Sequence, residues 1–208
     1  MAVATGRDGK APTRIQQRNR DAILDAGLDA FAQAGYRAAT LDQIAAGAGL
    51  SKPNLLYYFP SKEAIYEALL ARLLETWLDP LRALDPAGEP KAELLAYVER
   101  KLALSRDYPR ESRLFANEIL AGAPQIGNVL SGDLKRLVDE RAAVIAGWSA
   151  AGRIAAVDPY HLIFSIWALT QHYADFEVQV RAVLGGGDPF PGAGRFLAGL
   201  YDGLLTPR

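Results

Sequence analysis

Hydrogen-bonding side chains are concentrated in the twelve-residue segment SKPNLLYYFPSK, residues 51–62. Lys52 and Lys62 carry ammonium groups, Asn54 carries an amide, and Tyr57 and Tyr58 carry phenolic hydroxyls. Such groups bind phosphate oxygens, and lysine and asparagine also bind base edges in the DNA major groove. This composition favours binding of nucleic acid.

Three short helices are expected to position these side chains. Thr13 is a possible N-cap for the first helix, which Gly35 ends, and Thr40 with Gln43 forms a capping box for the second. Ser51 caps the third helix and places Pro53 in its first turn, where the missing N–H breaks no helical hydrogen bond. Helix, glycine-containing turn and short helix form the layout of a DNA-binding helix-turn-helix.

We therefore predict a DNA-binding surface on this segment. In the alternative interpretation, the two tyrosines are partly buried core residues and the lysines are ordinary solvated charges. Three apolar residues of the third helix, Leu55, Leu56 and Phe59, are expected to face inward. The predicted DNA contacts are Thr40, Ser51, Lys52, Asn54, Tyr57, Tyr58 and Lys62.

The composition describes a chain with enough apolar residues for a large core. It has 208 residues, is 50% hydrophobic and contains no cysteine, which excludes disulfides and thiolate chemistry. Residues 1–62 hold eight Lys/Arg against five Asp/Glu, so a basic head precedes an acidic remainder. No signal sequence or membrane-spanning run is visible, and we expect a cytoplasmic protein.

Helical periodicity dominates the chain, and no alternating strand pattern is convincing. We predict an all-α fold of about nine helices, with a disordered tail over 1–12, a helix-turn-helix domain over 13–60 and a helical bundle over 61–208. The bundle serves ligand binding and dimerisation in this prediction. Its later helices are placed at 91–107, 109–121, 128–151, 159–183 and 195–205, with a Gly/Pro-rich loop over 185–194.

The stretch TLDQIAAGAGLSKPNLLYYFPSKEAIYEAL resembles the DNA-binding domain of the TetR family of transcriptional regulators. The matching positions are the capping Thr40, the helix-turn residues 44–45 and 48–51, the run 55–59 and Ser-Lys-Glu at 61–63. Leu50 replaces the usual valine, Leu56 a common tyrosine and Tyr58 the usual histidine. The resemblance implies a repressor that binds an operator as a homodimer and is released by a small ligand.

A closer resemblance, to pyrimidine-utilisation regulators of this family, runs from about Thr13 to Val183 and implies uracil or thymine as the ligand. The segment 185–194 and Asn117 depart from it. A planar pyrimidine needs aromatic faces and a group that both donates and accepts hydrogen bonds. The predicted ligand contacts are Trp77, Phe115, Asn117, Glu118, Trp167, Gln171 and Tyr173.

Three alternatives stay open at this point. The tryptophans are core residues in one of them, and Gln171, His172 and Asp175 line a dimer seam. In the second, the effector is another heterocycle or a hydrophobic compound. The third is an all-α enzyme or scaffold that does not bind DNA. No catalytic constellation or cofactor motif supports it, and the only histidines, His161 and His172, are eleven residues apart and unsuited to share a metal.

Dimerisation is expected because one helix-turn-helix reads only half of a symmetric operator. The helices predicted over 159–183 and 195–205 are apolar on more than one side. We therefore predict that they form the dimer interface.

Overall fold

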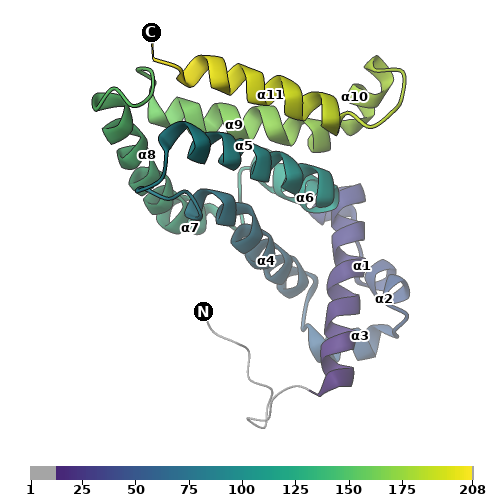
Figure 1. The fold of residues 1–208 in the computed structure, drawn as a ribbon. Helices are drawn as coiled ribbons and strands as arrows, with labels where there is room; N and C mark the ends of the chain where they lie inside the picture. Colours follow the sequence, from purple (N-terminus) through teal and green to yellow (C-terminus); the bar gives the residue numbers. More distant parts are fainter. Residues whose placement is uncertain (1–12, 208) are drawn as a thin grey trace. The chain divides into compact units, whose positions relative to one another are not determined.

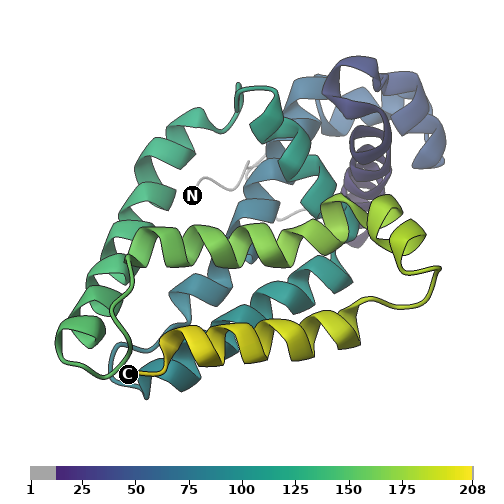
Figure 2. The same cartoon turned by 90° about the horizontal axis from the view of Figure 1, so that it is seen from above.

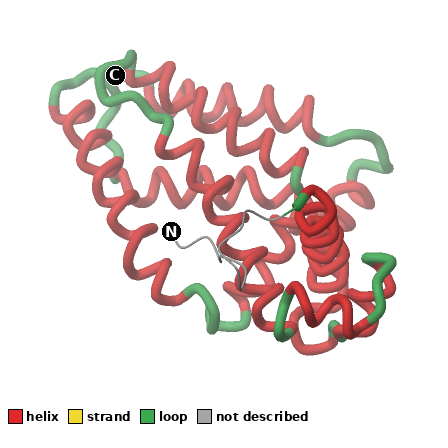
Figure 3. Tube along the Cα trace, turned by 90° about the horizontal axis from the view of Figure 1, so that it is seen from below, coloured by secondary structure: helices red, strands yellow, loops and turns green. Residues whose placement is uncertain are grey.

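The structure is a computed structural model that describes residues 13–207. All regular secondary structure in this range is helical, which confirms the predicted all-α class (Figure 1, Figure 3). The tail predicted over 1–12 lies outside the described residues. No helix within 13–207 is long and apolar enough to cross a membrane. The chain packs as two units, one ending at Ala71 and one beginning at Arg72.

The first unit begins with three helices whose N-caps were predicted. They are α1 (Arg14–Ala38), α2 (Leu41–Gly47) and α3 (Lys52–Tyr58), capped by Thr13, Thr40 and Ser51. Capping boxes are present at Thr13–Gln16 and Thr40–Gln43. Gly35 has a φ of +73°, but helical structure resumes after it, so this glycine kinks α1 and does not end it.

The core of the first unit lies where α1, α2 and α3 meet the beginning of α4 (Lys62–Arg82). Gly27 allows α1 and α4 to approach closely, because a Cβ at this position would lie 2.8 Å from Cγ2 of Ile65. Leu56, expected to face inward, is 38% exposed; the prediction was wrong because a seven-residue helix buries only one narrow face. The buried side chains include Ile23, Phe31, Ile44, Leu55, Phe59 and Ile65.

The second unit is a bundle centred on α5 (Pro90–Asp107), which packs against α9 (Pro159–Asp175) and α11 (Phe190–Leu205) (Figure 2). The other elements are α6 (Pro109–Leu120), α8 (Lys135–Ala150) and α10 (Glu177–Val183). A short α7 (Gly127–Val129) and a π-helical turn (Leu130–Leu134) precede α8.

Three predicted helices in this bundle differ from the observed ones. The helix predicted over 128–151 is divided into α7, the π-helical turn and α8. The helix predicted over 159–183 is interrupted at Phe176, whose φ of −113° and ψ of 30° are not helical. The last helix begins at Phe190, five residues early, because Pro191 is compatible with a first helical turn and Asp188 Oδ1 accepts the Phe190 N–H at 3.0 Å.

Candidate functional site

The turn between α2 and α3 fixes how the start of α3 is presented. Gly49 has a φ of +68°, a conformation that residues with a side chain rarely adopt. The N–H groups of Gly49 and Leu50 donate to the carbonyls of Ala46 and Ala45 at 3.1 and 2.9 Å. Ser51 Oγ then accepts the Asn54 N–H at 3.4 Å. Residues 51–54 are all exposed, so the N-terminus of α3 is open to solvent.

Lys52 lies at this exposed N-terminus with an acidic neighbour from α2. Its Nζ donates to Asp42 Oδ2 at 2.9 Å, and both side chains are well exposed. An exposed ion pair of this kind contributes little to stability, at most about 1 kcal/mol. The pair therefore orients Lys52 without occupying all of its ammonium protons.

The adjacent tyrosines occupy different environments. Tyr57 is 73% exposed, whereas Tyr58 is half-buried. The Tyr58 hydroxyl accepts a hydrogen bond from Asn19 Nδ2 of α1 at 2.9 Å, and its carbonyl accepts one from Arg20 at 3.4 Å. The two rings meet edge to face, 5.1 Å apart. Tyr57 is thus available to a ligand over most of its surface, while Tyr58 also joins α3 to α1.

Lys62 and Thr40 make contacts within the protein. Lys62 Nζ donates to the carbonyls of Tyr36 and Ala39 at 2.7 and 2.8 Å, and lies 4.5 Å from the centre of the Tyr36 ring. Thr40 Oγ1 accepts the Gln43 N–H at 3.2 Å and donates to the Gln43 side chain. Both side chains therefore stabilise helix ends around the surface predicted to bind DNA.

Sequence reasoning did not identify the supporting residues Asn19, Arg20 and Asp42. Asn19 precedes its partner Tyr58 by 39 residues. No local pattern in the sequence signals a contact over this distance. Asp42 lies in the first turn of α2, and its carboxylate accepts a hydrogen bond from Lys52.

The residues predicted to bind a ligand in the second unit differ in their exposure. Trp77 and Glu118 are buried, whereas Asn117 is exposed. Glu118 Oε1 accepts the Gln125 N–H at 2.7 Å and so holds the turn after α6. Trp167 Nε1 donates to Tyr97 Oη at 2.6 Å. Phe115, Trp167, Gln171 and Tyr173 are half-buried.

A buried lysine lies beside Trp77. The Lys101 side chain is 1% exposed, and its Nζ lies 4.9 Å from the centre of the Trp77 ring. Burial lowers the pKa of the Lys101 ammonium to about 7, and the charge of Asp175 opposes this lowering. The Nε1 atom of Trp77 is buried and has no hydrogen-bond partner among the described residues. Sequence reasoning missed Lys101, although it interrupts the apolar stripe of Leu94, Tyr97, Val98 and Leu102.

Asp175 lies at the end of α9, near Lys101. Burial raises the pKa of its carboxyl group. The hydroxyl of the fully buried Ser112, which donates a hydrogen bond to this carboxylate, and the charges of Arg113, Lys101 and His172 oppose the increase. Lys101, Ser112 and Asp175 therefore place polar chemistry inside the bundle, next to its apolar core.

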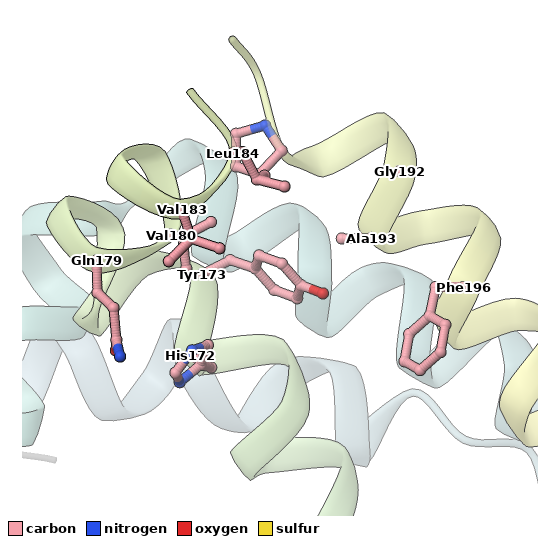
Figure 4. A pocket seen from close by; sticks show the side chains of 10 residues that line it. His172, Tyr173, Gln179, Val180, Val183, Leu184, Gly192, Ala193 and Phe196 are labelled. Carbon is pink, nitrogen blue, oxygen red and sulfur yellow. The ribbon is translucent and has the colours of Figure 1, made fainter. Parts of the chain in front are cut away.

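A separate apolar pocket of about 460 Å³ lies between the end of α9, α10 and the start of α11 (Figure 4). Its walls include His172, Val180, Leu184 and Phe196. Of the residues predicted to bind a ligand, only Tyr173 lines it, with its hydroxyl between the helices (Figure 4).

The outer surfaces of α9 and α11 carry large exposed apolar side chains. On α11 they recur every four residues, at Phe196, Leu200 and Leu204, with exposures of 61%, 41% and 46%. On α9, Phe164 and Leu169 are exposed. An apolar stripe at helical spacing is typical of a helix that packs against another helix.

Comparisons with known proteins match both parts of the chain. Residues 23–69 match the family model of bacterial regulatory proteins of the tetR family, and residues 70–189 match the C-terminal region of YcdC-like proteins. The chain is 54% identical over 173 residues to the HTH-type transcriptional regulator RutR of Escherichia coli K12, covering 83% of this chain and 82% of that protein.

Solved structures show the same fold at low sequence identity. The ketosteroid transcriptional regulator KstR2 of Mycobacterium tuberculosis superposes with a TM-score of 0.69 and 19% identity, over 96% of this chain and 98% of that one. AibR, solved in complex with isovaleryl coenzyme A and operator DNA, superposes with a TM-score of 0.67 and 19% identity, over 91% of this chain and 100% of that one. The chain belongs to the TetR family and is a helix-turn-helix transcriptional regulator.

Proposed function

We propose that this chain is a homodimeric repressor that binds an inverted-repeat operator and is released by uracil or thymine. It would control pyrimidine-utilisation genes in the cytoplasm, without enzymatic activity of its own. The observation that carries the proposal is the 54% identity to RutR, because it extends over 173 residues and therefore beyond the helix-turn-helix. The resemblance of the sequence to pyrimidine-utilisation regulators supports the choice of effector.

The DNA-binding role falls to residues 13–60, and within them to the N-terminus of α3. Lys52, Asn54 and Tyr57 are exposed there and supply donors for base edges and phosphates. The free N–H groups of the first helical turn add attraction for phosphate. Thr40, Ser51, Tyr58 and Lys62 act mainly by fixing the helices that present these donors, since each is engaged within the protein.

Residues 61–208 are proposed to bind the effector and to form the dimer. The exposed apolar residues of α9 and α11 supply a self-complementary surface for a two-fold dimer. Coupling between effector and operator is assigned to α4, which carries Lys62 at its start and Trp77 near its end. The effector would favour a spacing of the two DNA-binding units that does not fit the operator.

An electrophoretic mobility shift on the DNA upstream of the protein's own gene tests this proposal. The protein is expected to shift this DNA in the presence of competitor DNA, and uracil or thymine is expected to abolish the shift. A shifted band that persists across millimolar uracil and thymine contradicts the pyrimidine effector but not operator binding. A second effector class, another heterocycle or a hydrophobic compound, is then tested by thermal stabilisation with a ligand panel.

A further inference from the structure

We propose that Lys101, together with the indole N–H of Trp77, binds an acceptor oxygen of the effector, so that the effector must carry a carbonyl or carboxylate group. This inference rests on the proposed function and deepens it. It adds to the site a residue that the sequence did not suggest and restricts the chemical class of the ligand.

The first support is that a buried donor without an acceptor, Trp77 Nε1, lies on a side chain that contacts the buried Lys101. Trp77 Nε1 is buried and has no hydrogen-bond partner in the described part of the chain. Lys101 is 1% exposed, and its ammonium makes no hydrogen bond or ion pair with residues 13–207. Buried polar groups are normally satisfied, and a buried charge is normally paired. An orphaned indole N–H beside a buried ammonium therefore indicates a missing acceptor.

The second support is that the nearby acid does not neutralise Lys101. Asp175 is the charged group whose field acts on the Lys101 ammonium, but the pair does not reach ion-pair distance. The Asp175 carboxylate is instead held by Ser112, with Arg113 and His172 as further positive groups around it. The Trp77 ring also lies against the Lys101 ammonium, and its face attracts a cation but offers no lone pair on an oxygen.

The chemistry of the two groups defines which ligand group they can bind. An ammonium group and an indole N–H are donors only, so they select acceptors. A cyclic dione such as uracil presents two carbonyl oxygens, and one of them satisfies this pair of donors. A cationic ligand is repelled by Lys101, and a pure hydrocarbon leaves both donors unpaired. The proposed contact thus favours the pyrimidine effector over a hydrophobic compound.

Titration calorimetry on the full-length protein tests the contact with uracil and with 4-pyrimidinone, which lacks one carbonyl oxygen. Lys101→Met keeps the length of the side chain but removes charge and donors. We expect it to weaken uracil binding about tenfold or more, the effect of losing a charged hydrogen bond. It should also reduce the preference for uracil over 4-pyrimidinone. The control Lys135→Met removes an exposed lysine of the same unit and should leave both affinities unchanged.

A pH series separates direct contact from a structural role. If the Lys101 ammonium binds the ligand oxygen, wild-type affinity for uracil should fall between about pH 6 and 8.5, as the ammonium loses its proton. The affinity of the Lys101→Met variant for uracil should not change over this pH range. If Lys101 has only a structural role, the affinity for uracil should depend on pH in the same way in wild type and in the Lys101→Met variant.

The possible results are distinguishable. A folded Lys101→Met variant that binds uracil within twofold of wild type overturns the inference and leaves the proposed function intact. A wild-type protein that binds neither uracil nor thymine overturns both. Should Lys101→Met fail to fold, replacement of Trp77 by 3-(3-benzothienyl)alanine decides, because this analogue keeps a bicyclic aromatic ring of indole size and lacks the N–H. Weaker uracil binding by this variant supports the inference, and unchanged binding overturns it.

Discussion

Asn19 of α1 donates a hydrogen bond of 2.9 Å to the hydroxyl of Tyr58 at the end of α3. This bond joins the first and third helices of the DNA-binding unit across 39 residues of sequence. Because Tyr58 directly follows the exposed Tyr57, the same bond anchors the end of α3 that carries Tyr57.

Asn19→Ala should therefore weaken operator binding without removing any predicted DNA contact. We expect a loss of about 0.5–1.5 kcal/mol in the free energy of unfolding, typical of one hydrogen bond. Urea denaturation and fluorescence anisotropy with labelled operator measure the two effects. Gln17→Ala is a control, since Gln17 makes only an exposed bond to Asp21 on the same helix. Equal operator affinity in both variants would show that Tyr58 needs no support from α1.

Lys52 and Tyr57 should contribute to affinity but not to folding. Tyr57→Ala removes a side chain that is 73% exposed, so its melting temperature should match that of wild type while operator binding weakens. Lys52→Ala should reduce the slope of log affinity against log salt by about one, as for the loss of one phosphate contact. An unchanged salt slope would assign Lys52 to its pair with Asp42 alone.

The Lys62→Met substitution should reduce the stability of the protein and should not change the salt dependence of operator binding. Its ammonium holds the carbonyls of Tyr36 and Ala39, and leaving such groups unpaired costs about 1–3 kcal/mol. Denaturation should therefore reveal a clear loss of stability, while the salt dependence of operator binding stays that of wild type. A reduced salt slope at wild-type stability would restore Lys62 as a phosphate contact.

Lys101 should make the stability of the protein depend on pH above neutrality. The folded chain releases the Lys101 proton at a pKa of about 7, whereas the unfolded chain holds it up to the ordinary value of 10.5. Between these values the unfolded state binds more protons, so the free energy of unfolding rises with pH. Lys101→Met should lack this rise and should be more stable at pH 7 by about 1–3 kcal/mol, because it removes an unpaired buried charge. Thermal melts at constant protein concentration measure both effects.

The apolar stripe of α11 should control the oligomeric state. Leu200→Glu places a charge in the middle of the proposed dimer surface and should convert a dimer to a monomer, as measured by light scattering after size-exclusion chromatography. Leu120→Glu is a matched control, because Leu120 is 84% exposed and lies on α6, outside this stripe. A dimer that survives Leu200→Glu would place the interface elsewhere.

Local signals in the sequence predicted local structure well. Thr40 with Gln43, and Ser51 with Pro53, define helix starts within four residues of sequence, and the structure confirms both starts. Features that depend on packing were missed or misplaced. The break at Phe176 has no glycine or proline to mark it, and the early start of α11 was hidden by prolines that suit a first helical turn.

The candidate sites were likewise predicted only where their residues lie close together in the sequence. The exposed donors of α3 were found because they are crowded within a few residues. Their partner Asn19 was not found, since only folding brings it to Tyr58. Lys101 was detectable in principle as a charge at a core position of the α5 stripe. Its position over Trp77, and the absence of a partner for the indole N–H, required the structure.

The anchoring of Lys62 has a mechanical consequence for the DNA-binding unit. The first residue of α4 is tied to the last turn of α1 and to the carbonyl of Ala39, immediately before the Thr40 cap of α2. Any displacement of the start of α4 is therefore passed to α1 and α2 together, and α2 carries α3 through the tight turn at Gly49. We therefore expect the DNA-binding unit to keep its internal shape when the start of α4 is displaced. In a dimer, we expect a signal that arrives through α4 to alter the distance between two intact DNA-binding units and not to unfold either one.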